Sequence, residues 1–289
     1  MAAPSSSSSS PFPEVQGGGS LLLAWQIKGK HVLVVGGGEV AAGRILACLN
    51  ADALVTVVCP AAGLNPEVRH RVELGQVAHV DRLFLESDLD AVPEPVPAHP
   101  EPKPDPESGP PAPSLLLLAI ASPAASTAAY RAAQRRRIPA NIADVPPECD
   151  FYFGAVHRAG PVQVLVSTNG RGPRLAAALK RHIAAHLPRA AGPAVENVGL
   201  LRAALRARAP GDGVDEGRRR MRWMSRVCDR YGWEELGVMD EVDRRNLLEG
   251  WWEGGEVPRW AELRALRGAE DGGRQVWEFD GSFGFSVGC

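Results

Sequence analysis

The chain has 289 residues, of which 45% are hydrophobic and 23% charged, which is typical of a globular protein with one large or two to three small domains. Its net charge of −2 favours neither nucleic acid nor an anionic membrane, and no apolar stretch reaches the roughly 18–20 residues that span a bilayer. Five scattered cysteines without a Cys-x-x-Cys motif argue against a disulfide framework or a structural zinc site. Because we also find no secretory signal pattern, we expect a cytoplasmic protein.

The most informative stretch follows a Ser-, Pro- and Gly-rich segment, residues 1–20, that we expect to be a disordered tail. An apolar run at 31–35 predicts a buried strand that ends in a glycine turn, and a helical pattern begins at once. This is the context of the dinucleotide fingerprint Gly-x-Gly-x-x-Ala. Gly36 would permit the turn, Gly38 would leave room for a pyrophosphate, and Ala41 would let the helix pack on the strand. The alternative is a turn with only a structural role.

The next elements continue an alternation of strands and helices. A strand at 54–58 completes a βαβ unit, and a helix at 66–75 and a short strand at 77–80 follow. Residues 93–114 contain ten prolines, which remove backbone donors from helices and sheets, so we expect a flexible surface insertion there. The apolar residues 115–120 then predict another buried strand.

The middle of the chain mixes both element types. We expect a helix of small residues near 124–136 and a strand edge at 138–144. Apolar or alternating residues at 151–153 and 162–167 predict two further strands. A turn then leads into a helix at 174–187, where a proline near the helix start is favourable.

The C-terminal part is predicted to be helical. Residues 194–252 show an amphipathic helical pattern with a break at 210–213, and the last thirty residues have no clear assignment. The arginine clusters at 135–137 and 218–220 are short, and we interpret both as solvated helix faces. His182 and His186 have a spacing that can hold a metal, but no third ligand is evident, so a solvated face is favoured there too.

A nucleotide bound to such a sheet lies at the carboxyl ends of the strands. The second strand is followed by neither an acid nor an arginine, so the sequence does not itself distinguish NAD from NADP. The residues expected to line the groove follow the first, second and fourth strands; they are Gly36, Gly37, Gly38, Glu39, Val40, Pro60, Ala61, Ser122 and Pro123.

Three segments resemble the fungal bifunctional precorrin-2 dehydrogenase/sirohydrochlorin ferrochelatases of the siroheme synthase family. They are Val32–Ala41, Asn141–Ala155 with its Asn-Ile-Ala-Asp start, and Gly160–Arg174. The helical stretch that follows is similar to the C-terminal domain of these enzymes, though more loosely. The resemblance covers roughly residues 20–255, and it implies siroheme biosynthesis: NAD-dependent oxidation of precorrin-2, followed by insertion of Fe²⁺ as a substrate.

The resemblance also implies an α/β fold with an N-terminal Rossmann-type parallel sheet, a central α+β domain that forms a homodimer, and a small C-terminal helical domain. Dehydrogenase activity alone and a non-catalytic dimer that binds NAD and a tetrapyrrole are the alternatives. The expected divisions are a tail at 1–20, the NAD-binding domain at 21–148 with the insertion at 93–114, the dimerisation domain at 149–190, the helical domain at 191–258 and a tail at 259–289.

One aspartate is implicated in both steps of the family's chemistry, and Asp144 matches it. A carboxylate can accept the proton lost on oxidation and the pyrrole protons displaced by iron, or present transient Fe²⁺ to the macrocycle. On the local sequence alone, an aspartate that caps N–H groups in the turn before Val145 is an equal interpretation.

The acidic arms of a tetrapyrrole require cations and helix N-termini. Arg171 and Arg174 flank a predicted helix start, and together with Ser167 and Asn169 they are our candidates for binding the substrate. Solvent-facing arginines, with Ser167 or Asn169 as a cap, are the alternative.

Overall fold

The computed structural model describes residues 17–91, 112–211 and 213–271. Residues 1–16 of the predicted disordered tail lie outside the described residues. Most of the predicted proline-rich insertion at 93–114 also lies outside them.

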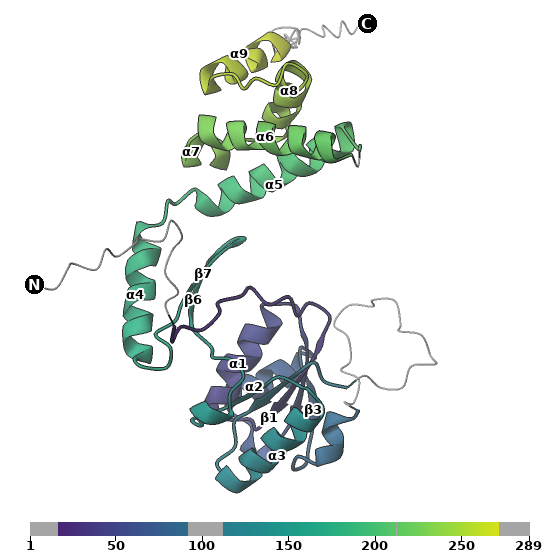
Figure 1. Cartoon of the computed structure of the whole chain (residues 1–289), viewed down its shortest axis with the longest axis vertical. Coiled ribbons are helices and arrows are strands. Elements are labelled where there is room, and N and C mark those ends of the chain that lie inside the picture. Colours follow the sequence, from purple (N-terminus) through teal and green to yellow (C-terminus); the bar gives the residue numbers. More distant parts are fainter. Residues whose placement is uncertain (1–16, 92–111, 212, 272–289) are drawn as a thin grey trace, which may run out of the picture. The chain divides into compact units, whose positions relative to one another are not determined.

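The described residues belong to two compact units (Figure 1). One unit runs to Phe153 and includes Ser167–Gly172, and the other contains Gly154–Val166 and the chain from Pro173 onwards. No described helix is long and apolar enough to cross a membrane.

The first unit is built on a five-stranded parallel sheet with the strand order β3-β2-β1-β4-β5. This is the Rossmann arrangement expected from the sequence. Its strands are β1 (His31–Val35), β2 (Leu54–Val58), β3 (Ala78–Val80), β4 (Leu115–Leu118) and β5 (Ala140–Ile142). Its helices are α1 (Glu39–Leu49), α2 (Pro66–Glu73) and α3 (Pro123–Arg135), with the 3₁₀ turns η1 (Ala61–Gly63), η2 (Glu86–Leu89) and η3 (Pro146–Glu148).

Helices cover both faces of this sheet. Successive side chains of a strand point to opposite faces, so Val32 and Val34 of β1 pack in one cluster with α1 and α2. Leu33 and Val35 pack in a second cluster with α3. A strand buried on both faces is apolar at every position, which explains why continuous apolar runs marked these strands in the sequence.

The second unit begins with an antiparallel hairpin in which Val156 pairs with Leu165. A long helix follows the hairpin, and a helical bundle completes the unit around buried Trp223 and Trp252. The elements are β6 (Ala155–Ala159), β7 (Val162–Val166), α4 (Pro173–His186), α5 (Ala191–Arg208), α6 (Val214–Arg230), α7 (Trp233–Gly237), α8 (Glu241–Trp251) and α9 (Trp260–Asp271).

One predicted strand requires correction. Phe151–Phe153 form no strand, because they lie in an irregular segment whose rings pack edge-on, with Phe151 against Trp25 and Phe153 against Phe151. The segment without an assignment contains a helix, α9, in its described part.

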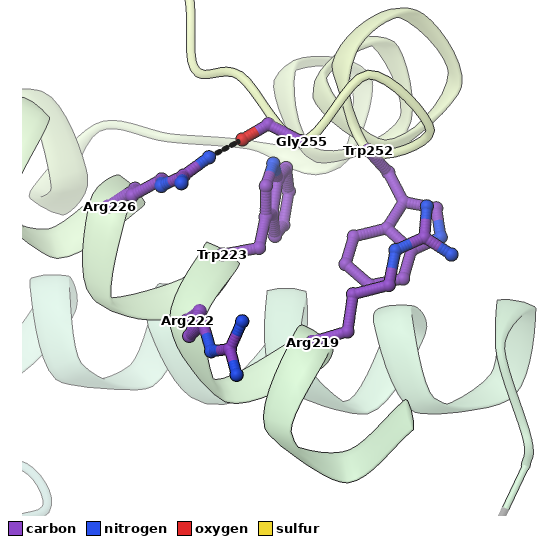
Figure 2. A pocket seen from close by; sticks show the side chains of 6 residues that line it. All are labelled: Arg219, Arg222, Trp223, Arg226, Trp252 and Gly255. Atoms are coloured by element: carbon purple, nitrogen blue, oxygen red, sulfur yellow. Dashed lines mark hydrogen bonds between the residues drawn. The ribbon is translucent and has the colours of Figure 1, made fainter. Parts of the chain in front are cut away.

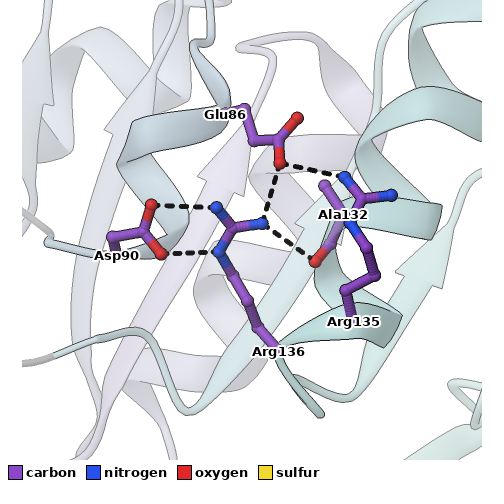
Figure 3. A network of polar contacts seen from close by, with 5 residues as sticks. All are labelled: Glu86, Asp90, Ala132, Arg135 and Arg136. Atoms are coloured by element: carbon purple, nitrogen blue, oxygen red, sulfur yellow. Dashed lines mark hydrogen bonds and ion pairs between the residues drawn. The ribbon is translucent and has the colours of Figure 1, made fainter.

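The arginine clusters are not merely solvated, as Figure 3 shows for the first of them. Arg136 binds Asp90 in a bidentate pair with its Nε 2.6 Å from Oδ1, and it reaches Glu86 at 3.0 Å. In the second cluster, Arg220 donates to the carbonyl of Gly211 at 2.8 Å and so holds the break between α5 and α6. The interpretation as solvated faces therefore fits the exposed Arg135, Arg137 and Arg218, and it is incomplete for Arg136 and Arg220, whose partners lie on other elements.

Asp88 is a buried carboxylate that organises the turn η2. Its oxygens lie 2.5 and 2.8 Å from the Arg82 guanidinium, and the Leu85 N–H donates to it at 2.9 Å. Burial alone would raise the pKa of the Asp88 carboxyl, but the hydrogen bonds from Arg82 and Leu85 outweigh it and lower the pKa.

We therefore expect Asp88→Asn to lower the free energy of unfolding by about 1–3 kcal/mol at pH 7. Asp52→Asn, at an exposed aspartate of the same unit whose side chain forms no hydrogen bond or ion pair with a described residue, is the matched control and should change it little. Because the native pKa of Asp88 is depressed, its contribution is present above about pH 4 and is lost as the pH falls through the native pKa. Urea unfolding at pH 7 and pH 3 measures both effects; an equal loss for the two variants would contradict them.

Candidate functional site

The glycine turn lies at the carboxyl end of β1. The chain adds β2 and β3 on one side of β1 and β4 and β5 on the other, so this is the topological switch point of the sheet. Gly36 has φ of 104°, and a Cβ built on it would collide with the carbonyl oxygen of Ala119. A Cβ on Gly37 would lie 2.8 Å from Leu64 Cδ2 and 2.9 Å from the Gly63 oxygen. These two glycines are therefore required by packing.

Gly38 differs from its neighbours. It is the N-cap of α1, and no heavy atom of the described residues outside its own chain neighbours lies within 4 Å of a Cβ built on it. No side chain caps the helix there, so the first N–H groups of α1 remain available to an external acceptor. The exposed side chains of Glu39 and Val40 border this space. The geometry suits an anionic group held by backbone donors.

A carboxylate that the sequence analysis missed, Asp81, lies beside the turn that follows β2. Pro60 caps η1, and the Ala61 N–H donates to Asp81 Oδ1 at 2.7 Å. Arg69 donates to the Ala61 carbonyl at 3.3 Å. Asp81 follows β3, which pairs with β2, so an acid does lie at this edge although it comes from the neighbouring strand.

Ser122 and Pro123 begin α3 after β4. Ser122 is the N-cap and accepts from the Ala125 N–H at 3.4 Å, while Pro123 occupies the first turn. Both side chains are exposed at the carboxyl edge of the sheet, and their contact with a cofactor stays a prediction.

Asp144 follows β5 at this same edge. Its backbone is left-handed, with φ of 59°, and its side chain is exposed. In the described part of the chain its carboxylate accepts no hydrogen bond, so the interpretation of Asp144 as a capping residue finds no support. A carboxylate that is exposed, held in a turn and not hydrogen-bonded is available to an external partner.

The turn that carries Asp144 is anchored by the segment that returns alongside β5. Asn141 and Cys149 form an antiparallel bridge. The buried Asn141 amide donates to the Phe151 carbonyl at 2.7 Å, and Asp150 Oδ2 accepts from the Ala140 N–H at 2.8 Å. The motif noticed in the sequence is therefore largely a clamp around one exposed aspartate.

Cys149 contributes to this clamp as a thiol. Its Sγ donates to the Ile142 carbonyl at 3.1 Å. Burial raises the pKa of Cys149, which the Ile142 N–H only partly offsets, so the sulfur is not a thiolate nucleophile at neutral pH.

The expected substrate-binding residues after β7 have two different environments. Ser167 Oγ accepts from the Asn169 N–H at 3.1 Å, a bond within the loop that precedes α4. The Asn169 side chain accepts from Ser20 Oγ at 2.6 Å and donates to the Gly18 carbonyl at 2.8 Å. Residues 17–20 therefore contact this loop, which corrects the expectation of a tail that is disordered throughout.

Arg171 and Arg174 are exposed, and neither side chain forms a hydrogen bond or ion pair with any described residue. They belong to different units. Both are available to a ligand, and their role stays a prediction.

A cavity of about 120 Å³ lies in the helical bundle (Figure 2), and no predicted site residue lines it. Three arginines and Trp223 of α6 line it, together with Trp252, which directly follows α8. Their donors bind the loop that follows α8: Trp223 Nε1 donates to the Glu256 carbonyl at 2.9 Å, Arg219 to the Glu253 carbonyl at 3.2 Å, and Arg226 to the Gly255 carbonyl. These contacts fasten the loop to the bundle.

No group of three or more metal-ligating side chains occurs among the residues the structure describes. His182 and His186 stack at 4.4 Å between ring centroids, and His186 Nδ1 contacts the His182 carbonyl at 2.8 Å.

Comparison with known proteins agrees with this geometry. A family model described as NAD(P)-binding matches residues 23–155. Models of the central and C-terminal parts of sirohaem biosynthesis proteins match residues 159–186 and 188–258. A siroheme biosynthesis protein of Schizosaccharomyces pombe is 45% identical over 239 residues, which cover 83% of this chain and 82% of that protein.

The chain belongs to the siroheme biosynthesis protein family. It is also 30% identical to siroheme synthase 1 of Serratia proteamaculans over 63% of its own length but only 33% of that longer protein. Among solved structures, SirC, a precorrin-2 dehydrogenase, has a TM-score of 0.55 at 18% identity and covers 81% of this chain and 100% of its own. That similarity supports the fold.

The glycine turn yields a stability prediction. Gly36→Ala should lower the free energy of unfolding by about 2–4 kcal/mol, because φ is positive and the new Cβ meets a backbone oxygen. Gly38→Ala is the matched control and should be nearly neutral, since its φ is −75° and the space is open. Thermal and urea unfolding compare the two; a stable Gly36→Ala protein would refute the account of the turn.

Proposed function

We propose that this member of the siroheme biosynthesis family carries out two reactions at Asp144. The first is the oxidation of precorrin-2 to sirohydrochlorin with NAD⁺, and the second is the insertion of Fe²⁺ as a substrate. The observation that supports this most is the exposed Asp144 carboxylate, which shares the carboxyl edge of the sheet with the glycine turn of a matched NAD(P)-binding segment.

The residues present fit a dinucleotide. The open space at Gly38 and the uncapped start of α1 suit a pyrophosphate. Asp81 places a carboxylate beside Ala61, but the Arg69 guanidinium contacts the carbonyl of the same residue, so the choice of NAD over NADP rests on the family resemblance. When bound, NAD supplies the hydride acceptor.

The role of Asp144 follows from charge balance. Removing a hydride from a carbon centre and a proton from its neighbour leaves the oxidised macrocycle, so a base must accept the proton. Insertion of Fe²⁺ releases two pyrrole protons, which again require an acceptor. A carboxylate without internal hydrogen-bond donors can serve both steps in turn, and Arg171 of the same unit would bind an acidic arm of the substrate. A substrate-binding role of Arg174, on the other unit, stays a prediction.

A division into the NAD-binding domain at 21–148, the dimerisation domain at 149–190 and the helical domain at 191–258 belongs to this proposal, and the three family matches support it. A cytoplasmic location also belongs to this proposal. The four cysteines of the described chain form no disulfide, which supports a reducing compartment.

Purified protein should convert precorrin-2 to sirohydrochlorin with NAD⁺ and more slowly with NADP⁺. Addition of Fe²⁺ should then yield siroheme, followed by absorbance. Oxidation without iron insertion would leave the dehydrogenase-only alternative, and binding without turnover would leave the non-catalytic dimer.

Asp144→Asn should lower the rates of both steps by about 10²–10⁴-fold. Asparagine also tolerates the left-handed backbone, so the fold should persist, and NAD affinity should change by less than about twofold. Steady-state assays of each step and an NAD titration measure this. Full activity in either step would remove Asp144 from that step.

The homodimer is also part of the proposal. A stripe on α4 is apolar and exposed: Leu175 is 68%, Leu179 51% and Ile183 37% exposed. The cross-strand pair Val156 and Leu165 on the hairpin is exposed as well. Side chains of this type in adjacent elements are typical of an interface that a second copy covers.

Leu179→Asp should convert the dimer to a monomer, because it places a charge in the centre of the apolar stripe. Leu83→Asp is the control, since Leu83 is 73% exposed on the other unit. Light scattering at micromolar concentration distinguishes them. A wild-type monomer, or a Leu179→Asp dimer, would contradict the proposed interface.

A further inference from the structure

Helix α1 carries a cation that the proposed chemistry does not use. Arg44 reaches from this helix to the carboxyl ends of two strands: its Nη1 donates to the Leu118 carbonyl at 2.7 Å and lies 3.5 Å from the Asn141 carbonyl. Leu118 ends β4, and Asn141 lies in β5. One guanidinium therefore joins the two neighbouring strands at the edge that precedes Asp144.

The Leu118 carbonyl is shared. It accepts from Arg44 and also from the N–H of Ala143, at 2.9 Å, and Ala143 immediately precedes Asp144. A carbonyl oxygen has two lone pairs, so both bonds form at once. The position of the Asp144 turn is therefore coupled through one oxygen atom to the position of the Arg44 guanidinium.

The surroundings of Arg44 are half-buried and rich in titratable groups. Burial lowers the pKa of Arg44, and Cys149, Asp144 and Cys48 oppose that shift. An arginine remains protonated in such a setting, so the positive charge persists. The Phe153 ring centroid lies 5.8 Å from its Cζ and covers one side of the guanidinium.

We propose that Arg44 is a positioning residue that holds the Asp144 turn against the sheet edge. This inference rests on the proposed function for the chemistry of Asp144, whereas the positioning itself does not. Arginine suits the role because its guanidinium keeps its charge when half-buried, and the two hydrogens of Nη1 can meet the Leu118 and Asn141 carbonyls.

The test uses three variants of the full-length protein. Arg44→Met removes the charge and the donors but keeps much of the apolar stem. Arg44→Lys restores the charge. Arg131→Met is the matched control, because Arg131 is exposed on α3 and makes no ion pair or hydrogen bond with its side chain among the described residues.

Hydrogen exchange followed by mass spectrometry reads the positioning without any turnover. In Arg44→Met the amides of residues 143–145 should exchange about tenfold faster, Arg44→Lys should lie between it and the wild type, and Arg131→Met should match the wild type. Unchanged exchange in Arg44→Met, or faster exchange spread evenly over the Rossmann unit, would overturn the proposal, since the second result describes general destabilisation.

The kinetic arm asks whether Arg44 acts through Asp144. Arg44→Met should lower kcat of both steps by a common factor of about ten or more, with NAD affinity unchanged within twofold and partial rescue in Arg44→Lys. In the Asp144→Asn background the same change should cost nothing further, because the residue it positions is already disabled. Additive losses, or loss of one step alone, would overturn the proposal. A wild type without either activity would refute the proposed function, while the exchange measurement would still decide the role of Arg44.

Discussion

The parallel pairing of β1 with β2 on one side and β4 on the other is the constraint on which the site depends. Parallel strands all end at the same edge, so the glycine turn, the η1 turn, the start of α3 and the Asp144 turn meet there although up to about a hundred residues separate them. Helices on both faces make most strand positions apolar, with Thr56 in β2 and Asn141 in β5 as buried polar exceptions. The candidate site residues of this unit therefore lie beyond the carboxyl ends of the strands, where the backbone ladder no longer pairs the chain.

The parts of the fold that the sequence predicted well are those with local causes. Buried strands are continuous apolar runs, and the glycine turn has its own steric signature at Gly36. The errors arose where the cause is distant. Asp81 bonds to Ala61 from another strand, and Arg136 finds Asp90 from a separate element. Phe151–Phe153 are apolar because their rings pack on one another, and no strand pairs with them.

The candidate site could be predicted as a set of residues but only partly as an arrangement. The position of Asp144 came from a family motif, and its left-handed backbone and lack of an internal donor came only from the structure. The neighbouring Asn141, Cys149 and Asp150 act as anchors, because their bonds close the return segment onto β5. A motif can therefore contain one reactive group and several residues that keep it in place.

The clasp between Asn169 and residues 17–20 has a practical consequence for anyone preparing this protein. Gly18 and Ser20 provide both hydrogen-bonding partners of the Asn169 amide. A shortened protein that begins at Leu21 would lack both of these partners. The loop between β7 and α4, which contains Asn169, would then lose this attachment. Catalytic rates measured on such a shortened version would describe an altered molecule, so affinity tags are better attached ahead of an intact N-terminal segment.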